Sequence, residues 1–401
     1  MALIAVDMTP LLPGGENGGV KLLALELLKG FQNQSPEHEF LLLTTSGNHQ
    51  ALAFLDGPRT RRLCVIDRHL AIPPVKPGLP ARIVRRLRRI SRLLRRQYRE
   101  RRPWKGPLSA RGVDALFCPF TAPTYAEPKI PVISIVCDLQ HKDYPQFFTP
   151  EELDLRESIF SEVGRRADAI ICISESTRAS VIQHLKVDPD RTRAIPVCIQ
   201  SRLAASGTAV LSGELRELHI DERPYMFYPA NFWPHKNHLM LVAAYGMFAA
   251  RNPDCRLDLV FTGALDEAQR DLKHKVRCMG LERQVHFLGY LPEAQVTAVW
   301  KGCSFLIFPS LYEGFGIPVL EAMQFGKPVV CSKVTSLPEV AGDAALYFDP
   351  RKPFEMVQCL EKMIGDEALH ADLIRRGDAR LSSFRPEEMV KQYLQCIEAV
   401  I

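Results

Sequence analysis

The chain has 401 residues, which predicts two domains, each large enough for its own hydrophobic core. Hydrophobic residues make up 46% and charged residues 24%, values typical of a soluble globular protein and not of a disordered or fibrous one. The eleven cysteines contain no C-x-x-C pair and lie mostly in apolar runs. They argue against a disulfide framework or a metal cage and indicate a reducing compartment.

The N-terminus lacks the pattern of a signal peptide, since Asp7 interrupts the first apolar run. No run reaches the roughly 18 apolar residues that a membrane-spanning helix needs. We therefore expect a cytoplasmic protein, with a peripheral position on the inner face of the cytoplasmic membrane as an open alternative.

A short strand at residues 3–6 opens the chain and is followed by a loop that ends in Gly18 and Gly19. Helical spacing begins at Val20. A strand, a glycine-rich loop and a helix form a candidate phosphate cradle, although the spacing is not that of a dinucleotide fingerprint. A flexible turn is the alternative interpretation.

Residues 81–105 contain eleven arginines and Lys105 but only one acidic residue, Glu100. Apolar residues recur at helical spacing through this segment, which predicts a basic amphipathic helix over residues 81–102. Such helices lie on anionic lipid, here through Arg85, Arg88, Arg92 and Arg95. A helix packed on the N-terminal sheet is the alternative, and nucleic acid is the least favoured partner because no aromatic interleaving accompanies the arginines.

Two further buried strands are predicted at residues 114–118 and 132–137. The second ends in a polar stretch that contains Asp138 and His141, and open α/β sheets bind ligands at the carboxyl ends of their strands. His141 is equally interpreted as a histidine that anchors the loop. A strand at residues 168–174 ends at Ser174, which can cap the next helix, and residues 199–222 are interpreted as a linker.

The second domain begins with a strand at residues 225–229, and the loop after it contains His235 and Lys236 just before a helix. A cation at a helix start is unfavourable for that helix unless an anion lies nearby. Lys236 is therefore placed to neutralise a diphosphate leaving group, with an ordinary surface lysine as the alternative.

Residues 302–328 form the most informative segment of the chain. A buried strand is followed by a glycine loop, a short helix that begins near Pro318, and an exit at Gly326. Glu313 in the loop and Glu321 in the helix lie eight positions apart, and a carboxylate can accept hydrogen bonds from two neighbouring hydroxyls. Together with the helix start, they predict a site for a sugar diphosphate. Two solvated glutamates are the alternative.

This segment resembles the Glu-x7-Glu signature of glycosyltransferase family 4, and residues 336–345 continue the likeness. The resemblance implies an α/β protein of the GT-B fold, with two doubly wound Rossmann-like domains that face each other across a cleft. We expect an N-terminal, acceptor-side domain at 1–205 that includes the basic helix, a nucleotide-sugar-binding domain at 222–383 and a C-terminal helix at 384–401. This helix would cross back to the first domain, with a hinge near Phe384.

The resemblance also implies roles for single residues. Glu313 and Lys236 are the expected catalytic residues, together with Asp138 and His141. The expected donor-binding residues are Gly18, Gly19, His235, Lys236, Gly263, Leu288, Gly314, Phe315, Gly316, Ile317 and Glu321. The chain departs from the family at two positions: Cys137 replaces a histidine that contacts the transferred sugar, and Ala230 replaces an arginine. His141 is the candidate to take over part of the role of that missing histidine.

The implied reaction moves a hexose from a nucleoside diphosphate sugar to a hydroxyl of a glycan or lipid-linked acceptor, with retention at the anomeric carbon. GDP-mannose is the favoured donor and a UDP-sugar the next. No metal and no cofactor are expected, because no D-x-D-type cluster accompanies the site. The alternatives are a GT-B epimerase, a phosphorylase that would need pyridoxal phosphate, and a catalytically silent scaffold.

Overall fold

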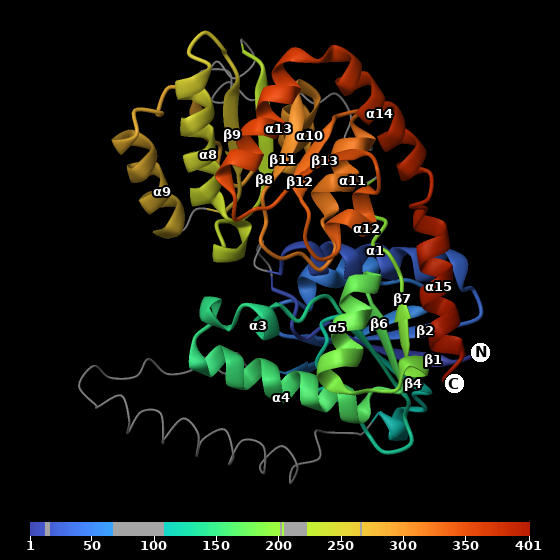
Figure 1. Cartoon of the computed structure of the whole chain (residues 1–401). Helices are drawn as coiled ribbons and strands as arrows, with labels where there is room; N and C mark the ends of the chain where they lie inside the picture. The colour runs from blue at the N-terminus through green and yellow to red at the C-terminus, as the bar shows by residue number, and fades with distance from the viewer. Residues whose placement is uncertain (13–16, 67–107, 201–202, 204–222, 265–266) are drawn as a thin grey trace, which may run out of the picture. The chain divides into compact units, whose positions relative to one another are not determined.

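The computed structural model describes residues 1–12, 17–66, 108–200, 203, 223–264 and 267–401 (Figure 1). The predicted basic helix at 81–102, with Arg85, Arg88, Arg92 and Arg95, lies outside these residues, as does most of the predicted linker. Those predictions are therefore not tested by the structure.

The first sheet has seven strands in the order β3-β2-β1-β4-β5-β6-β7. The bounds of its strands are β1 Leu3–Asp7, β2 Glu39–Thr45, β3 Thr60–Ile66, β4 Ala115–Cys118, β5 Val132–Val136, β6 Ala169–Cys172 and β7 Thr192–Ala194. The pairs β1–β2, β2–β3, β1–β4 and β4–β5 are parallel. β4 and β5 are buried along their whole length, as expected for parallel strands covered on both faces.

The second sheet has six strands in the order β10-β9-β8-β11-β12-β13, and every neighbouring pair is parallel. Its strands are β8 Tyr225–Pro229, β9 Asp258–Thr262, β10 Val285–Phe287, β11 Phe305–Phe308, β12 Val329–Ser332 and β13 Ala345–Phe348. Both sheets reverse their strand order once, as doubly wound folds do. In the second sheet the reversal falls between β8 and β11, so a ligand is expected beyond the carboxyl ends of these two strands.

Helices connect the strands of both sheets (Figure 1). The helices that belong with the first sheet are α1 Gly18–Gln34, α3 Gln140–Asp143, α4 Pro150–Arg166 and α5 Glu175–Leu185. Those that follow are α8 His238–Arg251, α9 Glu267–Cys278, α10 Glu293–Gly302, α11 Ile317–Gln324, α12 Leu337–Ala341, α13 Pro353–Gly365, α14 Glu367–Leu381 and α15 Pro386–Glu398. Short 3-10 turns are η1 Gln50–Leu55, η2 Ser109–Arg111, η3 Pro145–Phe147, η4 Pro189–Arg191 and η5 Pro234–Lys236.

Helix α1 begins earlier than its sequence pattern indicates. The spacing predicts a helix from Val20, whereas the helix begins at Gly18 and includes Gly19. Gly18 has a positive φ of 53°, a conformation that glycine adopts without the steric cost of a side chain. Gly18 and Gly19 therefore form the first turn of the helix and do not belong to the loop before it.

The chain separates into two compact units that do not follow the sequence in single pieces. The first comprises Met1–Ile135, Ile159–Ile170 and Leu394–Ile401, and the second comprises Val136–Ser158 and Ile171–Tyr393. The division passes through the seven-stranded sheet and through α15. The predicted domain borders at 205, 222 and 384, and the predicted hinge near Phe384, stay predictions.

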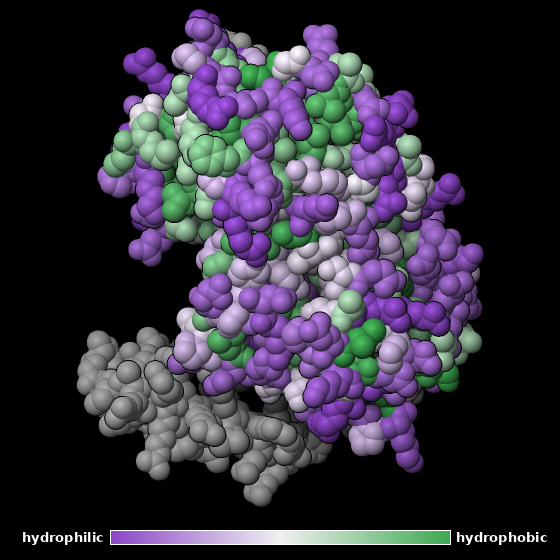
Figure 2. Space-filling view, viewed as in Figure 1, coloured by the Kyte–Doolittle hydropathy of each residue, from purple (hydrophilic) through white to green (hydrophobic). Residues whose placement is uncertain are grey.

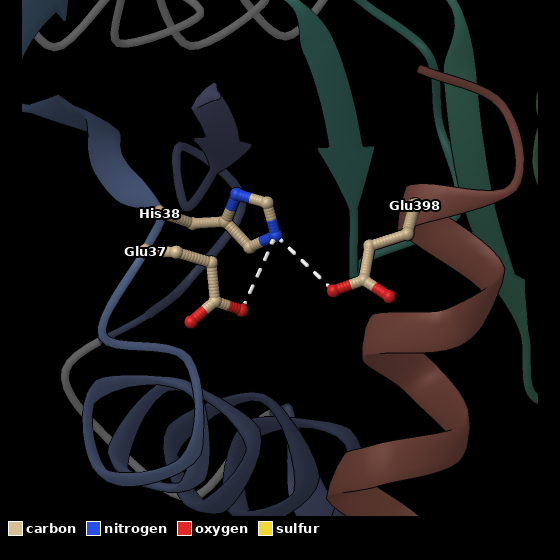
Figure 3. Close-up of side chains that lie close together, drawn as sticks. All are labelled: Glu37, His38 and Glu398. Atoms are coloured by element: carbon tan, nitrogen blue, oxygen red, sulfur yellow. Dashed lines mark hydrogen bonds and ion pairs between the residues drawn. The ribbon is translucent and has the colours of Figure 1, made fainter. Parts of the chain in front are cut away.

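The end of α15 contacts the loop before β2 within the first unit (Figure 3). The Nε2 atom of buried His38 lies 3.2 Å from a carboxylate oxygen of Glu398 and 3.7 Å from one of Glu37. Both carboxylates are exposed to solvent, which limits the strength of such pairs to about 1 kcal/mol or less. The cluster fixes the position of the last turn of α15 more than it stabilises the unit.

Hydrophilic residues predominate on the face shown in Figure 2, and hydrophobic residues are scattered among them. Large exposed hydrophobic side chains, such as Phe54 and Tyr290, come from distant parts of the sequence. Scattered exposure of this kind is normal for a folded protein and marks no binding surface. Within the described residues, no helix combines the length and apolarity needed to cross a membrane.

Candidate active site

Lys236 ends the short turn η5 beyond the carboxyl end of β8. The turn begins after extended Trp233 and contains Pro234, whose missing N–H costs nothing in a first turn. Asn237 follows in the left-handed conformation, with a φ of 62°. Its side-chain amide donates hydrogen bonds to the carbonyls of Pro309 (3.1 Å) and Pro350 (2.9 Å). The loop that carries Lys236 is thereby tied to the loops after β11 and β13.

Glu313 lies in the loop between β11 and α11, and this loop is held by its backbone. The hydroxyl of Ser336 donates to the carbonyls of Glu313 (3.0 Å) and Phe315 (2.9 Å). The amide of Glu313 donates to Thr335 Oγ1 at 3.1 Å, and the amide of Leu311 donates to the carbonyl of His235 at 2.7 Å. The position of the Glu313 backbone is therefore set on both sides.

The glycines of this loop are required by close approaches. A Cβ atom on Gly314 would lie 2.0 Å from the carbonyl oxygen of Cys137, which no real contact permits. Gly316 has a φ of 100°, and a Cβ atom there would lie 2.5 Å from the side chain of Leu337. The carbonyl of Gly314 accepts hydrogen bonds from Ser174 Oγ (2.7 Å) and Thr177 Oγ1 (3.2 Å). The glycine loop thus packs directly on the turn that contains Asp138.

Lys236 and Glu313 form an ion pair, with 2.6 Å between Nζ and Oε1. Their side chains are only 14% and 10% exposed. Removing two charges from water is costly unless they pair closely, and this pair does so where β8 and β11 end. The structure therefore brings together the two predicted catalytic residues that lie 77 positions apart in the sequence.

Tyr228 contacts the backbone of Lys236. Its hydroxyl donates to the carbonyl of Lys236 at 2.8 Å and lies 3.3 Å from the hydroxyl of Ser310. Burial raises the pKa of Tyr228 well above its usual value, and the carboxylate of Glu313 raises it further. The phenol therefore stays protonated and acts as a fixed hydrogen-bond donor.

Glu321 lies inside α11, one turn after Ile317, and is only 5% exposed. The helix begins at Ile317, Pro318 in its first turn has no N–H, and the amide of Val319 donates to the carbonyl of Gly316 at 3.0 Å. Residues four positions apart share a helix face, so Glu321 and Ile317 lie on the same face of α11. A ribose hydroxyl pair is a suitable ligand for such a buried carboxylate.

The histidines of the site are uncharged at neutral pH. Burial and, less strongly, the charge of Lys236 lower the pKa of His235 to about 3, while Asp138 opposes the shift. Burial also lowers the pKa of His141, whose Nε2 lies 3.6 Å from Glu157 and whose ring meets Phe148 edge-on. These contacts are those of a histidine that anchors its loop. Asp138 accepts a hydrogen bond from the amide of Gln140 and forms a local turn.

The other predicted donor-binding residues lie at the ends of neighbouring strands. Gly263, with a φ of 150°, follows β9, and a Cβ atom there would lie 2.4 Å from the carbonyl of Ala230. Its amide donates to Gly289, and the amide of Leu288 donates to Phe261, both at 2.9 Å. Gly18 and Gly19 belong to the first unit, at the start of α1.

Several residues near Glu313 carry no signal of their own in the sequence. Tyr144 donates from its hydroxyl to the carbonyl of Leu311 at 3.2 Å, and Arg351 donates to the Tyr144 hydroxyl. Glu339 accepts hydrogen bonds from the amides of Glu175 (2.8 Å) and Ser176 (3.1 Å) at the start of α5. The one local signal was at Ser174, where the predicted cap is confirmed by its acceptance of the Thr177 amide at 3.0 Å.

Two protein-family models match the chain over most of its length. The model described as Glycosyltransferase Family 4 matches residues 17–201, and that described as Glycosyl transferases group 1 matches residues 215–380. The chain belongs to glycosyltransferase family 4. The resemblance seen around Glu313 is thereby confirmed.

The family 4 chain is similar to several curated proteins. It is 28% identical over 248 residues to the O-antigen chain mannosyltransferase B of Escherichia coli, a match that covers 62% of this chain and 65% of that protein. It is 31% identical over 222 residues to the serotype-specific mannosyltransferase WbdA of Escherichia coli, which covers 55% of this chain and 27% of WbdA. The chain thus spans less than two thirds of the length of either relative.

Solved structures share the fold. Anabaena HepE in complex with UDP-glucose superposes with a TM-score of 0.72 at 16% identity, and the match covers 100% of both chains. WaaG, a glycosyltransferase involved in lipopolysaccharide biosynthesis, gives a TM-score of 0.68 at 14% identity, with 98% of this chain and 99% of WaaG covered. The predicted GT-B fold is confirmed by these neighbours and by the two doubly wound sheets.

Proposed function

We propose that this family 4 protein is a retaining hexosyltransferase that uses a nucleoside diphosphate sugar and no metal ion. It transfers the hexose to a hydroxyl of a glycan or lipid-linked acceptor in envelope polysaccharide assembly. The ion pair of Lys236 and Glu313 at the carboxyl ends of β8 and β11 carries this proposal. The ammonium suits the diphosphate of a nucleotide sugar, and the carboxylate suits the hydroxyls of its hexose.

Donor binding separates the ion pair of Lys236 and Glu313. The diphosphate attracts the ammonium of Lys236, and the carboxylate of Glu313 then accepts hydrogen bonds from hydroxyls of the sugar. As the glycosidic bond breaks, negative charge grows on the departing phosphate, and Lys236 stabilises it in a site with little water. The amides that open α11 and the neutral ring of His235 add donors at the same place.

The transfer step retains the configuration of the anomeric carbon, which requires attack from the face that the phosphate leaves. We propose that the acceptor oxygen forms its bond to the anomeric carbon on that face while the bond to the phosphate oxygen breaks. The acceptor proton passes to the departing phosphate. Lys236 and the amides before α11 therefore act on the leaving group, and Glu313 orients the sugar.

Mannose and GDP are the favoured sugar and base. The E. coli relatives are named mannosyltransferases, and they match more closely in sequence than the HepE structure determined with UDP-glucose. UDP-sugars follow as the second choice because HepE shares the fold and binds one. The loops after β9 and β10, at Gly263 and Leu288, are the proposed base-binding elements.

A thermal-shift panel of GDP-mannose, UDP-glucose, ADP-glucose and dTDP-glucose tests the donor. A ligand that binds only the folded state stabilises it, by about 3 kcal/mol at a hundredfold excess over its dissociation constant. GDP-mannose should raise the melting temperature most, and Lys236→Ala should clearly reduce the shift. Lys275→Ala, in an exposed ion pair on α9, should leave the shift unchanged. Absence of any shift at millimolar donor would refute the proposal.

A GT-B epimerase and a silent scaffold are the alternatives that the site leaves open, because Cys137 and Ala230 replace a histidine and an arginine of the family. Product analysis separates the three. A transferase forms a glycoside only when acceptor is present, an epimerase releases a free altered sugar without acceptor, and a scaffold binds the donor without converting it.

A further inference from the structure

A polar pocket lies in the same unit as Glu313, beyond the carboxyl ends of β12 and β13. It encloses about 260 Å³ and is lined by Lys333, Val334, Tyr347, Asp349, Arg351 and Glu355. None of these residues belongs to the donor site described above. Drug-sized ligands occupy pockets of about 300 Å³ or more, so this pocket suits a single sugar ring and is too small for a nucleoside diphosphate sugar.

The charges of the lining residues balance. Two cations, Lys333 and Arg351, and two carboxylates, Asp349 and Glu355, line the pocket. Arg351 lies 3.8 Å from Asp349, and Lys352 beside the pocket lies 3.9 Å from Asp349 and 2.8 Å from Glu355. An anionic ligand would meet the carboxylates, and a cationic ligand would meet the guanidinium and the ammonium. A neutral ligand with many hydroxyls satisfies both kinds of group, because its hydroxyls accept from the cations and donate to the carboxylates. Val334 and Tyr347 offer an apolar wall to the C–H face of a sugar ring.

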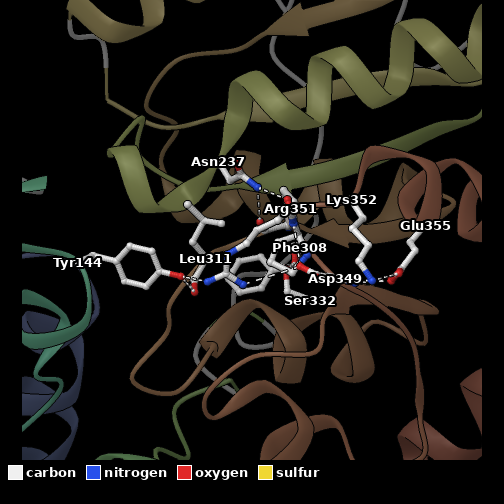
Figure 4. Close-up of polar contacts among 11 residues, drawn as sticks. Tyr144, Asn237, Phe308, Leu311, Ser332, Asp349, Arg351, Lys352 and Glu355 are labelled. Carbon is white, nitrogen blue, oxygen red and sulfur yellow. Dashed lines mark hydrogen bonds and ion pairs between the residues drawn. The ribbon is translucent and has the colours of Figure 1, made fainter. Parts of the chain in front are cut away.

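The polar walls of the pocket are already positioned (Figure 4). Asp349 accepts from the amide of Arg351 at 3.0 Å, and Glu355 accepts from the amide of Asp349 at 2.8 Å. Lys352 donates to the other oxygen of Glu355 at 2.8 Å. Within the part of the chain that the structure describes, Lys333 has no side-chain hydrogen bond or ion pair and is available to a ligand. The two carboxylates therefore need little ordering on binding, whereas the side chain of Lys333 must be ordered.

Two connections join this pocket to the loop of Glu313. Lys333 and Val334 precede Thr335, whose hydroxyl accepts from the amide of Glu313 at 3.1 Å. On the other side, Arg351 donates to the hydroxyl of Tyr144, which donates to the carbonyl of Leu311, two residues before Glu313 (Figure 4). The pocket therefore borders the loop that would hold the transferred sugar.

We propose that this pocket is a subsite for a neutral sugar unit of the acceptor glycan, next to the unit that receives the hexose. The proposal rests on the proposed transferase function. It assigns to Lys333 and Arg351 the recognition of acceptor length, which the donor-binding residues do not provide.

Saccharide binding measured by saturation-transfer NMR tests the subsite without turnover. The probes are mannose, mannobiose and mannotriose, with the wild-type protein and with Arg351→Ala and Lys333→Ala. The wild type should bind mannotriose more tightly than mannose. Each variant should lose about tenfold of that gain, as expected when a hydrogen bond to a charged group is removed. In transfer assays the KM for long acceptors should rise in the variants, while the shift caused by the nucleotide sugar stays unchanged.

Three controls separate the subsite from other effects. Lys362→Ala alters a different surface hollow on α13 and should keep the gain with length. Tyr144→Phe removes the hydrogen bond from Arg351 without emptying the pocket and should also keep it. Lys333→Ala, which breaks no described side-chain contact, covers the case in which Arg351→Ala folds poorly.

The outcomes distinguish this inference from the proposed function. Equal affinity of the wild type for all three saccharides, or an unchanged gain in both pocket variants, overturns the subsite. A length gain that both variants lose, in a protein that transfers no sugar from any donor, supports the subsite and overturns the transferase.

Discussion

The ammonium of Lys236 can pair with Glu313 or, in the proposed function, with the diphosphate of a donor. Without a donor it pairs with Glu313 at 2.6 Å, and both side chains are largely withdrawn from water. In the proposed function, the diphosphate of the donor competes with Glu313 for this ammonium, and donor binding breaks this ion pair. Hydrogen bonds from the sugar to the freed carboxylate then offset the free energy that is lost.

This competition predicts opposite effects for the two members of the pair. Lys236→Ala should weaken binding of free GDP by about tenfold or more, because a charged hydrogen bond is lost. Glu313→Gln should bind free GDP at least as tightly as the wild type, because Lys236 is released, yet lose about a hundredfold or more in kcat. Isothermal titration with GDP and assays with GDP-mannose measure both. Weaker GDP binding in Glu313→Gln would contradict the competition.

The two histidines near Lys236 make stability depend on pH. Burial lowers the pKa of His235 and of His238 to about 3, below the ordinary value of 6.5. Since the unfolded chain binds these protons first, the stabilising contribution of each neutral ring is complete above about pH 6.5. It is lost as the pH falls from there towards about 3.

Urea unfolding at neutral pH and at about pH 5 should therefore show a lower free energy of unfolding in acid, by about 1 kcal/mol or more for each histidine. His235→Asn should remove its part of this decrease. His274→Asn, an exposed residue on α9, serves as the control and should leave the decrease as in the wild type. An equal acid effect in His235→Asn and the wild type would exclude His235 as a source.

At the scale of elements, the loop between β11 and α11 is the most constrained segment of the site. It is fixed by hydroxyls from Ser174, Thr177 and Ser336 and by close packing of Gly314 on Cys137. Because these contacts fix the loop, its amides and the Glu313 carboxylate already have the orientation that the proposed function requires before a donor binds. Such preorganisation lowers the cost of reaching the transition state.

Gly314→Ala should disturb this loop strongly. The added methyl group would lie 2.0 Å from the carbonyl of Cys137, so one of the two segments must move. We expect a loss of about 1–3 kcal/mol in stability and a severe loss of transfer. Gly365→Ala, whose Cβ would meet no atom within 4 Å, is the matched control and should retain both. Thermal melts and transfer assays decide, and normal activity in Gly314→Ala would show that the close packing is dispensable.

Strands β8 and β11 of the second sheet were predictable because each carries a local signal. The strand before Glu313 is a continuous apolar run, and Pro318 and Gly326 mark the limits of the helix after it. Contacts between distant segments were not predictable from one sequence. Arg351 and Tyr144 are 207 positions apart, and neither residue type nor spacing announces that they meet. The packing of Gly314 on Cys137 was not predictable either, because these residues also lie far apart in the sequence.

At the scale of the whole molecule, the role of residues 81–102 at a membrane surface stays a prediction. Co-sedimentation with phosphatidylglycerol vesicles should decrease as salt increases, because the attraction of cations to anionic lipid is screened. Changing Arg85, Arg88, Arg92 and Arg95 to Ser should reduce binding by several kcal/mol in total, at about 1 kcal/mol per cation. Vesicles of neutral lipid are the control, and equal binding to both lipids would remove the membrane from the account.

The division of α15 between the two compact units has a consequence for biosynthesis. Residues Leu394–Ile401, together with the contact of Glu398 to His38, belong to the unit that begins at Met1. These residues are synthesised after the whole of Ile171–Tyr393, whereas most of that unit emerges early, and domains generally fold as they are made. The first unit of the nascent chain therefore lacks the helical turn after Tyr393 until the second unit has been made. The intervening unit can meanwhile acquire its fold first.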